Sequence, residues 1–343
     1  QLWSPGVKWD VQPGSYTHMS ELFGPVLGVM RARDLDEAID LVNRTGYGLT
    51  SGIETLDERE QGTWRERIRA GNLYINRVTT GAVVLRQPFG GMGKSVFGPG
   101  IKAGGPNYVA QLMDFAERAS AQAGAASEEE ASSDALLAGL AVRLRADRAG
   151  IPAGAAETER ALTAMESYRQ AWDQEFGRKH DHFRLLGQDN IRRYLPVREL
   201  RIRVHEDDSL FDLLARIAAA RTVGCRITLS VPPGCPSAPL AWLREATGNW
   251  GDTLETVEED DETLAGVIRD RRTERVRFAA QGRVPLMIHE AALNGGCYLA
   301  ARPVLAEGRV ELLWYLREQS ISVDYHRYGN LGERSQESRA PVL

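Results

Sequence analysis

The residues best suited to chemistry lie in a glycine-dense segment, residues 70–108. Gly81 and Ala82 are small and follow the polar run of residues 77–80, which leaves their backbone N–H groups open to an anion. Consecutive N–H groups in a turn form an anion-binding nest, and Phe89 would supply an apolar wall nearby. The pattern predicts a carboxylate site. A crowded buried loop, in which glycine only avoids clashes, has the same spacing, and the spacing alone does not decide between the two.

The same segment contains sequences similar to phosphate-binding loops, and each departs from its pattern. Residues 90–95 (GGMGKS) end like a P-loop, but Pro88 stands where the first glycine is required. Residues 98–103 satisfy GxGxxA, but no predicted strand precedes them and Pro99 occupies the tight turn. We therefore do not predict phosphate binding by these glycines.

A second short segment, residues 21–25 (ELFGP), places a carboxylate beside an aromatic ring and a Gly-Pro turn. In this arrangement Glu21 would hold ribose hydroxyls while the ring of Phe23 packs on a heterocycle. Five residues alone favour the plainer interpretation, which is a surface glutamate ahead of a turn.

Cysteine and histidine form no catalytic or metal-binding pattern that we can identify. Cys225, Cys235 and Cys297 are widely spaced and include no CxxC pair, so neither a zinc site nor a disulfide framework is predicted. Each is expected to be a small, buried, hydrophobic side chain. Free cysteines in odd number favour a reducing, cytoplasmic location. His180 and His182 are expected in a solvated polar turn.

The elements that would position the candidate residues divide the chain into blocks. In the first block, residues 1–115, helices are predicted at residues 35–43 and 57–70, and a strand at residues 73–76. This order is the one by which α/β enzymes present a loop at the C-terminal end of a strand. Residues 116–134 are rich in Ala, Gly, Ser and charge, and they are predicted to be a linker or a solvated helix.

The second block, residues 135–343, begins with two helical patterns and then alternates strands with helices. Helices are predicted at residues 135–149, 156–176, 209–220, 239–246, 261–271 and 284–292, and strands at residues 200–205, 225–231, 253–257, 276–279, 298–303 and 309–315. This repetition predicts a doubly wound, parallel, Rossmann-like α/β domain. Its loop at residues 231–235 has two prolines and one glycine, a poor phosphate cradle, so we predict a degenerate domain with a structural role. The basic run at residues 269–275 is expected to be a solvated helix end.

Composition limits the classes of function. The chain has 343 residues, 43% hydrophobic residues and a net charge of −5, which argues against a nucleic-acid binder or a DNA-binding regulator. No apolar run approaches the ~20 residues of a membrane span. The sequence begins without Met and without a secretory leader, and we expect it to be a fragment of a longer protein.

Three ordered motifs resemble a known family. They are ELFGPV (residues 21–26), NRTGYGLTSGI (residues 43–53) and AGNLYINRVTTGAVVLRQPFGGMGKSVFGPG (residues 70–100). In this order they are similar to the C-terminal part of an aldehyde dehydrogenase catalytic domain. The TTGAVV and QPFGG sequences resemble the L-glutamate γ-semialdehyde (pyrroline-5-carboxylate) dehydrogenase type. Residues 315–332 more loosely resemble the C-terminal tail of bifunctional proline-utilisation proteins, where it packs on the dehydrogenase domain.

The resemblance implies roles for the candidate residues. Glu21 would hold the nicotinamide-ribose hydroxyls of NAD, and Phe23 would pack beside the nicotinamide. Gly81 and Ala82 would bind the α-carboxylate of glutamate semialdehyde, and Phe89 would line the aliphatic stem. The resemblance also implies a homo-oligomer, and FAD if a proline dehydrogenase domain is present in the parent protein.

The departure from the family is equally informative. The family's nucleophilic cysteine and general-base glutamate lie upstream of the ELFGP motif, and no cysteine precedes Glu21 here. Because thiohemiacetal catalysis needs a thiolate, we assign no catalytic residue and expect the chain alone to be inactive. The predicted function is NAD-dependent oxidation of glutamate semialdehyde by the parent protein, with an upstream half as partner. Two alternatives stay open: a dehydrogenase of another carboxylated aldehyde, such as succinate semialdehyde, or a non-catalytic structural fragment.

Overall fold

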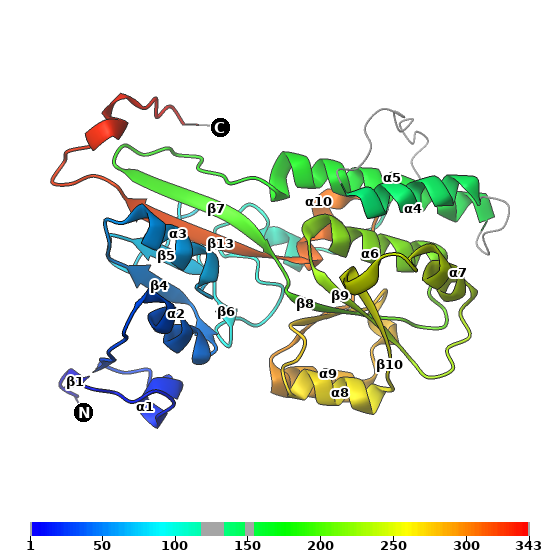
Figure 1. Cartoon of the computed structure of the whole chain (residues 1–343), viewed down its shortest axis with the longest axis horizontal. Coiled ribbons are helices and arrows are strands. Elements are labelled where there is room, and N and C mark those ends of the chain that lie inside the picture. Colours follow the sequence, from blue (N-terminus) through cyan, green and yellow to red (C-terminus); the bar gives the residue numbers. More distant parts are fainter. Residues whose placement is uncertain (1, 118–133, 148–153, 342–343) are drawn as a thin grey trace.

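The computed structural model describes residues 2–117, 134–147 and 154–341. Most of the predicted linker at residues 116–134 lies outside the described residues, and so does the end of the helix predicted at residues 135–149. The described part forms two lobes joined by long strands (Figure 1).

The helices are α1 (Tyr16–Met19), α2 (Leu35–Arg44), α3 (Glu58–Arg67), α4 (Ala135–Ala146), α5 (Gly154–Ala171), α6 (Leu210–Val223), α7 (Ala238–Ala246), α8 (Asp261–Arg269), α9 (Leu286–Gly295) and α10 (Gly308–Glu311). The strands are β1 (Gly6–Lys8), β2 (Val26–Gly28), β3 (Tyr47–Gly48), β4 (Thr50–Ile53), β5 (Asn72–Ile75), β6 (Met92–Gly93), β7 (Gln188–Pro196), β8 (Glu199–Arg203), β9 (Arg226–Val231), β10 (Leu254–Glu258), β11 (Arg275–Arg277), β12 (Tyr298–Ala300) and β13 (Leu316–Asp324).

The C-terminal lobe contains the predicted doubly wound sheet. Its strands lie in the order β10-β9-β8-β11-β12, and every pairing is parallel. Helices α6 and α7 cover one face, while α8 and α9 cover the other (Figure 1). The predicted helix at residues 209–220 begins as expected, because the Ser209 side chain and Asp212 form a capping box, and Gly224 ends it with φ 82°. The predicted α/β architecture is confirmed.

The N-terminal lobe contains a second sheet, and one of its four strands comes from the far end of the chain. Its order is β4-β5-β13-β7. Strand β13 pairs in parallel with β5 and antiparallel with β7 over nine residues. Ile321 of β13 packs in the same core cluster as Ile39, Trp64 and Leu73. The C-terminal segment is therefore part of the framework that supports the glycine-dense loop.

Three details of the sequence interpretation are wrong. Residues 309–315 form α10 and a short 3-10 turn, and the strand begins only at Leu316. The helix predicted at residues 57–70 ends at Arg67, since Ile68 turns to extended backbone and is buried. The basic run is not wholly solvated, because Arg275 lies buried in β11. In addition, β7 was not predicted.

Candidate functional site

The glycine-dense segment leaves the C-terminal end of β5 and folds back as a closed loop. Asn76 turns the chain with φ 57°, a conformation that asparagine tolerates, and its amide is fixed by two 2.9 Å hydrogen bonds to the main chain of Thr55. Val83 and Gln87 then pair with each other, the two N–H groups donating at 3.2 and 2.7 Å. The loop between β5 and Gln87 presents Gly81 and Ala82 on its exposed side.

The two predicted N–H donors of the loop are not used by the described fold. Gly81 has φ 130°, which disfavours any larger residue, and its carbonyl oxygen accepts a 2.9 Å hydrogen bond from the hydroxyl of Tyr74. Burial raises the pKa of Tyr74, so this donor stays protonated. Within the described residues, the N–H groups of Gly81 and Ala82 have no acceptor. This arrangement suits an anion.

Arg77 adds positive charge beneath the loop. Its side chain is 12% exposed, and its nearest carboxylate oxygen, on Asp324, lies 3.9 Å away. Nε and Nη1 of Arg77 are buried without a hydrogen-bond partner in the described part of the chain. A side chain on Gly81 would begin 3.9 Å from Nη2 of Arg77. A largely buried cation, paired with Asp324 only at 3.9 Å, next to two free N–H groups favours a negatively charged ligand.

Phe89 is half-buried and belongs to a well-anchored part of the same segment. Its main chain forms a two-way bridge with Ala103, and the hydroxyl of Ser320 on β13 donates to the carbonyl of the preceding residue, Pro88, at 2.6 Å. The ring is thereby held on the same loop as Gly81 and Ala82.

Glu21 and Phe23 occupy a different part of the lobe. They lie in the loop between α1 and β2, where Phe23 has φ 47° and is 93% exposed. Glu21 is exposed and makes no hydrogen bond or ion pair within the described residues. Within the described residues, no polar contact joins this pair to Gly81 or Ala82. The described fold thus places Glu21 near Phe23 in one loop and Gly81 next to Ala82 in another, without a polar contact between the two loops.

The three cysteines are free thiols with the character expected of structural residues. Burial raises the pKa of Cys225 to about 12 and that of Cys297 to about 11, and it also raises the pKa of the partly exposed Cys235. None is therefore a ready thiolate nucleophile at neutral pH. No cluster of three or more potential metal ligands occurs among the described residues, and no helix there is long and apolar enough to cross a membrane.

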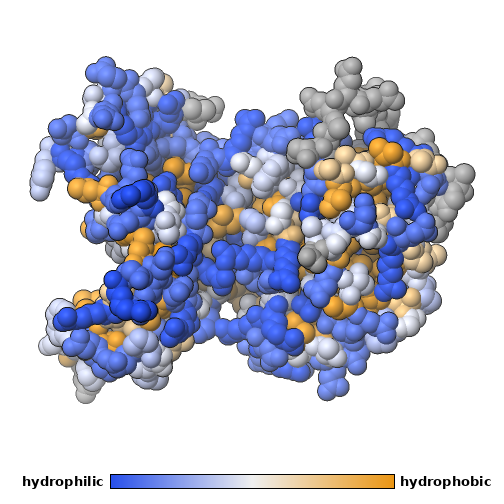
Figure 2. Space-filling model, in the orientation of Figure 1, coloured by the Kyte–Doolittle hydropathy of each residue, from blue (hydrophilic) through white to orange (hydrophobic). Residues whose placement is uncertain are grey.

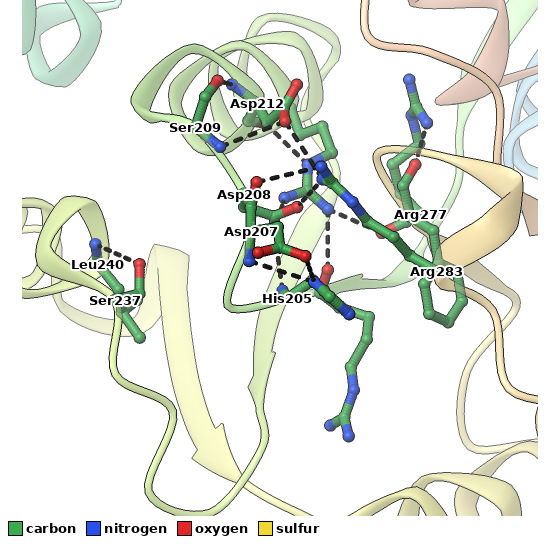
Figure 3. Close-up of polar contacts among 12 residues, drawn as sticks. His205, Asp207, Asp208, Ser209, Asp212, Ser237, Leu240, Arg277 and Arg283 are labelled. Atoms are coloured by element: carbon green, nitrogen blue, oxygen red, sulfur yellow. Dashed lines mark hydrogen bonds and ion pairs between the residues drawn. The ribbon is translucent and has the colours of Figure 1, made fainter. Parts of the chain in front are cut away.

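The doubly wound sheet has a topological switch point, the place where ligands bind in many such folds. The strand order reverses between β8 and β11, and this switch point is the usual ligand site. Here it is filled by charged side chains of the chain itself (Figure 3). Arg216 and Asp208 form a fully buried ion pair, and Arg283 donates to Asp208 and lies 3.2 Å from Asp212. The structural role of this domain stays a prediction.

Comparisons by sequence match the first third of the chain, and a comparison by structure matches both lobes. A model of the aldehyde dehydrogenase family matches residues 1–116. Over these residues the chain is similar to the aldehyde dehydrogenase family. The bifunctional protein PutA of Rhizobium meliloti is 55% identical over 98 residues, which are 28% of this chain and 8% of that protein. A 1-pyrroline-5-carboxylate dehydrogenase of Geobacillus sp. (strain WCH70) is 43% identical over 105 residues, 31% of this chain and 20% of that enzyme.

One solved structure is similar to nearly the whole chain. Proline Utilization A from Corynebacterium freiburgense matches with a TM-score of 0.67 and 33% identity, covering 96% of this chain and 28% of that protein. The chain thus spans less than a third of the length of each of these relatives. The likeness to the PutA structure extends beyond the aldehyde dehydrogenase segment into the doubly wound sheet.

Sequence reasoning missed the residues that shape the loop. Tyr74, Arg77 and Gln87 stand within the aldehyde dehydrogenase motifs, but their types alone did not mark them as supports. The buried asparagine of β7, Asn190, carried no signal, because the strand itself was not predicted. The one sign in the sequence was an arginine, Arg77, a few residues before the small residues Gly81 and Ala82.

Proposed function

We propose that the full-length protein carrying this chain oxidises L-glutamate γ-semialdehyde to L-glutamate with NAD, as a step of proline catabolism. The names of the relatives, 1-pyrroline-5-carboxylate dehydrogenase and PutA, support this substrate over succinate semialdehyde. In this proposal the cysteine nucleophile and the general base belong to parts of the full-length protein outside these residues.

The single observation that carries the proposal is the pair of free N–H groups at Gly81 and Ala82 beside Arg77. A carboxylate accepts such donors through its oxygen atoms, and the charge of the largely buried Arg77 side chain favours an anion there. Phe89 would contact the apolar carbons between the carboxylate and the aldehyde. These residues bind and orient one end of the substrate, so that the aldehyde carbon is held at a fixed distance from the nucleophile.

The two residues proposed to bind NAD, Glu21 and Phe23, are exposed and free to contact a nucleotide. The carboxylate of Glu21 has no competing partner in the described chain, and the ring of Phe23 is 93% exposed on a loop with unusual backbone geometry. Glu21 would accept hydrogen bonds from ribose hydroxyls, and Phe23 would pack beside the nicotinamide. NAD, when bound, supplies the hydride acceptor of the oxidation.

We further propose that an upstream dehydrogenase half covers the N-terminal elements. Large apolar side chains lie exposed there, including Trp3, Trp9 and Leu27, and Figure 2 shows apolar surface on this lobe. Contiguous exposed apolar surface marks an interaction site. The proposal also includes a homo-oligomer, and FAD in a proline dehydrogenase domain of the parent protein. It places the protein in the reducing cytoplasm, which suits three free thiols.

The test is NADH formation by the full-length protein with glutamate semialdehyde as substrate. The variant Ala82→Asp places a carboxylate where the substrate's own would bind and should raise KM at least about tenfold through like-charge repulsion, which corresponds to about 1.4 kcal/mol. Val84→Asp is the matched control, because it adds the same charge two residues away on a side chain that is 69% exposed.

Turnover by the wild type, with a KM increase confined to Ala82→Asp, would support both substrate and anchor. Equal effects of the two substitutions would remove the anchor assignment. An inactive full-length wild type would leave the non-catalytic alternative standing.

A further inference from the structure

The loop that presents Gly81 and Ala82 rests on a buried amide, that of Gln87. The side chain of Gln87 is 4% exposed, and a Cβ atom on Gly81 would lie only 2.7 Å from its Oε1. Gln87 also closes the loop through its main-chain pairing with Val83. Because Gly81 sits against the amide with no room to spare, the position of that amide fixes the position of the two free N–H groups.

The amide of Gln87 is held from the other side by Asn190 of β7. Nε2 of Gln87 donates to Oδ1 of Asn190 at 3.0 Å in a buried contact. The same Oδ1 accepts the hydroxyl of Ser322 at 3.2 Å, and Nδ2 of Asn190 donates to Oε1 of Gln188 at 3.0 Å. Asn190 is 3% exposed. With both ends of its amide engaged, it has one orientation only.

These contacts come from strands far along the chain. Gln87 and Asn190 are 103 residues apart, and Ser322 lies directly opposite Asn190 in the antiparallel pairing of β7 with β13. A loop normally derives its shape from its own turn residues. This loop derives its shape from two paired strands, β7 and β13. They hold Oδ1 of Asn190, the acceptor for the Gln87 amide, in a fixed position.

We propose that Asn190 is a positioning residue for the carboxylate site. The inference rests on the proposed function and adds to it a residue that touches neither substrate nor cofactor. Without Asn190, the Gln87 amide would lose its buried acceptor and shift to find another, because an unsatisfied buried donor is costly. The Gly81 turn would move with it, and binding of a carboxylate would weaken while the reacting end of the substrate kept its contacts.

The experiment compares two aldehydes on the full-length protein, glutamate semialdehyde and propanal, which has no carboxylate. Asn190→Ala should raise KM for glutamate semialdehyde about tenfold, equivalent to about 1.4 kcal/mol, and leave KM for propanal and both kcat values unchanged. Gln87→Ala should act in the same way. The double variant should show no further rise in KM for glutamate semialdehyde, because both substitutions remove the same hydrogen bond between Gln87 and Asn190.

Two further variants guard against a general loss of structure. Ser322→Ala keeps Asn190 in place and removes only one donor to its oxygen, so it should give a smaller KM increase of the same selectivity. Asn107→Ala removes another buried asparagine, whose amide contacts Tyr194 and Glu318 rather than the loop, and should leave the ratio of the two KM values unchanged.

A KM for glutamate semialdehyde that stays at the wild-type value in Asn190→Ala, or one that rises equally for propanal, overturns the positioning role while leaving the proposed function intact. A wild-type protein that oxidises propanal but not glutamate semialdehyde overturns the proposed substrate, and the positioning role falls with it.

Discussion

The side-chain nitrogen of Lys102 lies 2.9 Å from Oδ1 of Asn72, the first residue of β5, and also contacts the carbonyl oxygen of Gly90. The lysine is 1% exposed. Burial lowers the pKa of Lys102 to about 7, although the carboxylate of Glu318 acts in the opposite direction. One amine therefore joins the strand that precedes the carboxylate loop to the segment that follows it. With a pKa of about 7, this amine is neutral in about half of the molecules at pH 7.

This lysine should make stability depend on pH. Its pKa is about 7 in the folded chain, against 10.5 for an ordinary exposed lysine, so between these values the unfolded chain binds the additional proton. Stability should therefore rise as pH increases from about 7 towards 8.5, with a limiting slope of about 1.4 kcal/mol per pH unit. Above that range the buried thiols of Cys225 and Cys297 act in the opposite direction, because their pKa values are raised in the folded chain. Below pH 7 the lysine is protonated in both states, so the whole cost of burying its charge persists. Urea unfolding at several pH values measures this slope.

Lys102→Met should flatten the slope of stability against pH, whatever it does to stability itself. Lys94→Met is the comparison, because Lys94 is an exposed lysine of the same segment that contacts the carbonyl of Thr45. If the Lys102 and Lys94 variants gave the same slope, the titration would have to be assigned to another group.

The buried ion pair between Arg277 and Glu311 should be the most sensitive polar contact of the C-terminal lobe. Both side chains are fully buried, Nη2 to Oε1 is 2.8 Å, and the hydroxyl of Tyr315 donates to the same oxygen at 2.8 Å. Glu311→Gln would leave the arginine charge uncompensated and should lower the free energy of unfolding by about 3–5 kcal/mol, measured by denaturant titration.

An exposed ion pair serves as the control for this loss of unfolding free energy. Arg143 and Glu245 also form an ion pair, but Glu245 is 74% exposed, so Glu245→Gln should cost less than about 1 kcal/mol. Similar losses from the two substitutions would contradict the assignment of a special role to the buried pair.

The proposed cofactor contact of Glu21 gives a kinetic prediction for the full-length protein. Glu21→Gln removes a charged acceptor and should raise KM for NAD about tenfold, since hydrogen bonds to a charged group contribute about 1.5–3 kcal/mol. The KM for the aldehyde and the melting temperature should stay unchanged, because the side chain has no partner within the described fold. Glu54→Gln, at another exposed glutamate, is the control. An unchanged KM for NAD would exclude Glu21 from the cofactor site.

Sequence patterns predicted the doubly wound sheet well because its local signals agree with its packing. Ser209 caps α6, Gly224 ends it, and β9 follows as a strand in which polar and apolar residues alternate. Each of these signals lies within a few residues of the element that it defines. The buried ion pair of Arg216 and Asp208 was not predictable, because the two side chains meet only when the sheet has formed.

The candidate site was predictable in its exposed residues but not in its supports. Gly81 and Ala82 stand out because small residues and a turn leave N–H groups free, and this can be read locally. Asn190 and Ser322 lie on strands whose alternation is obscured: β7 buries Arg192 and Arg193, and β13 buries polar residues on both faces. Polar residues in a buried strand suggest a loop to any interpretation based on hydrophobic periodicity.

The pairing of β13 with β5 also leads us to expect an order of folding during synthesis. Gln319 donates to the carbonyl of Ala70, 249 residues earlier in the chain. Until the ribosome has made β13, the strand that carries the carboxylate loop has an open edge, and open edges invite wrong partners. The doubly wound lobe, by contrast, has all its strands before β13 and pairs them within itself. We therefore expect the C-terminal lobe to fold first. The sheet of the N-terminal lobe should be completed only after β13 has been synthesised.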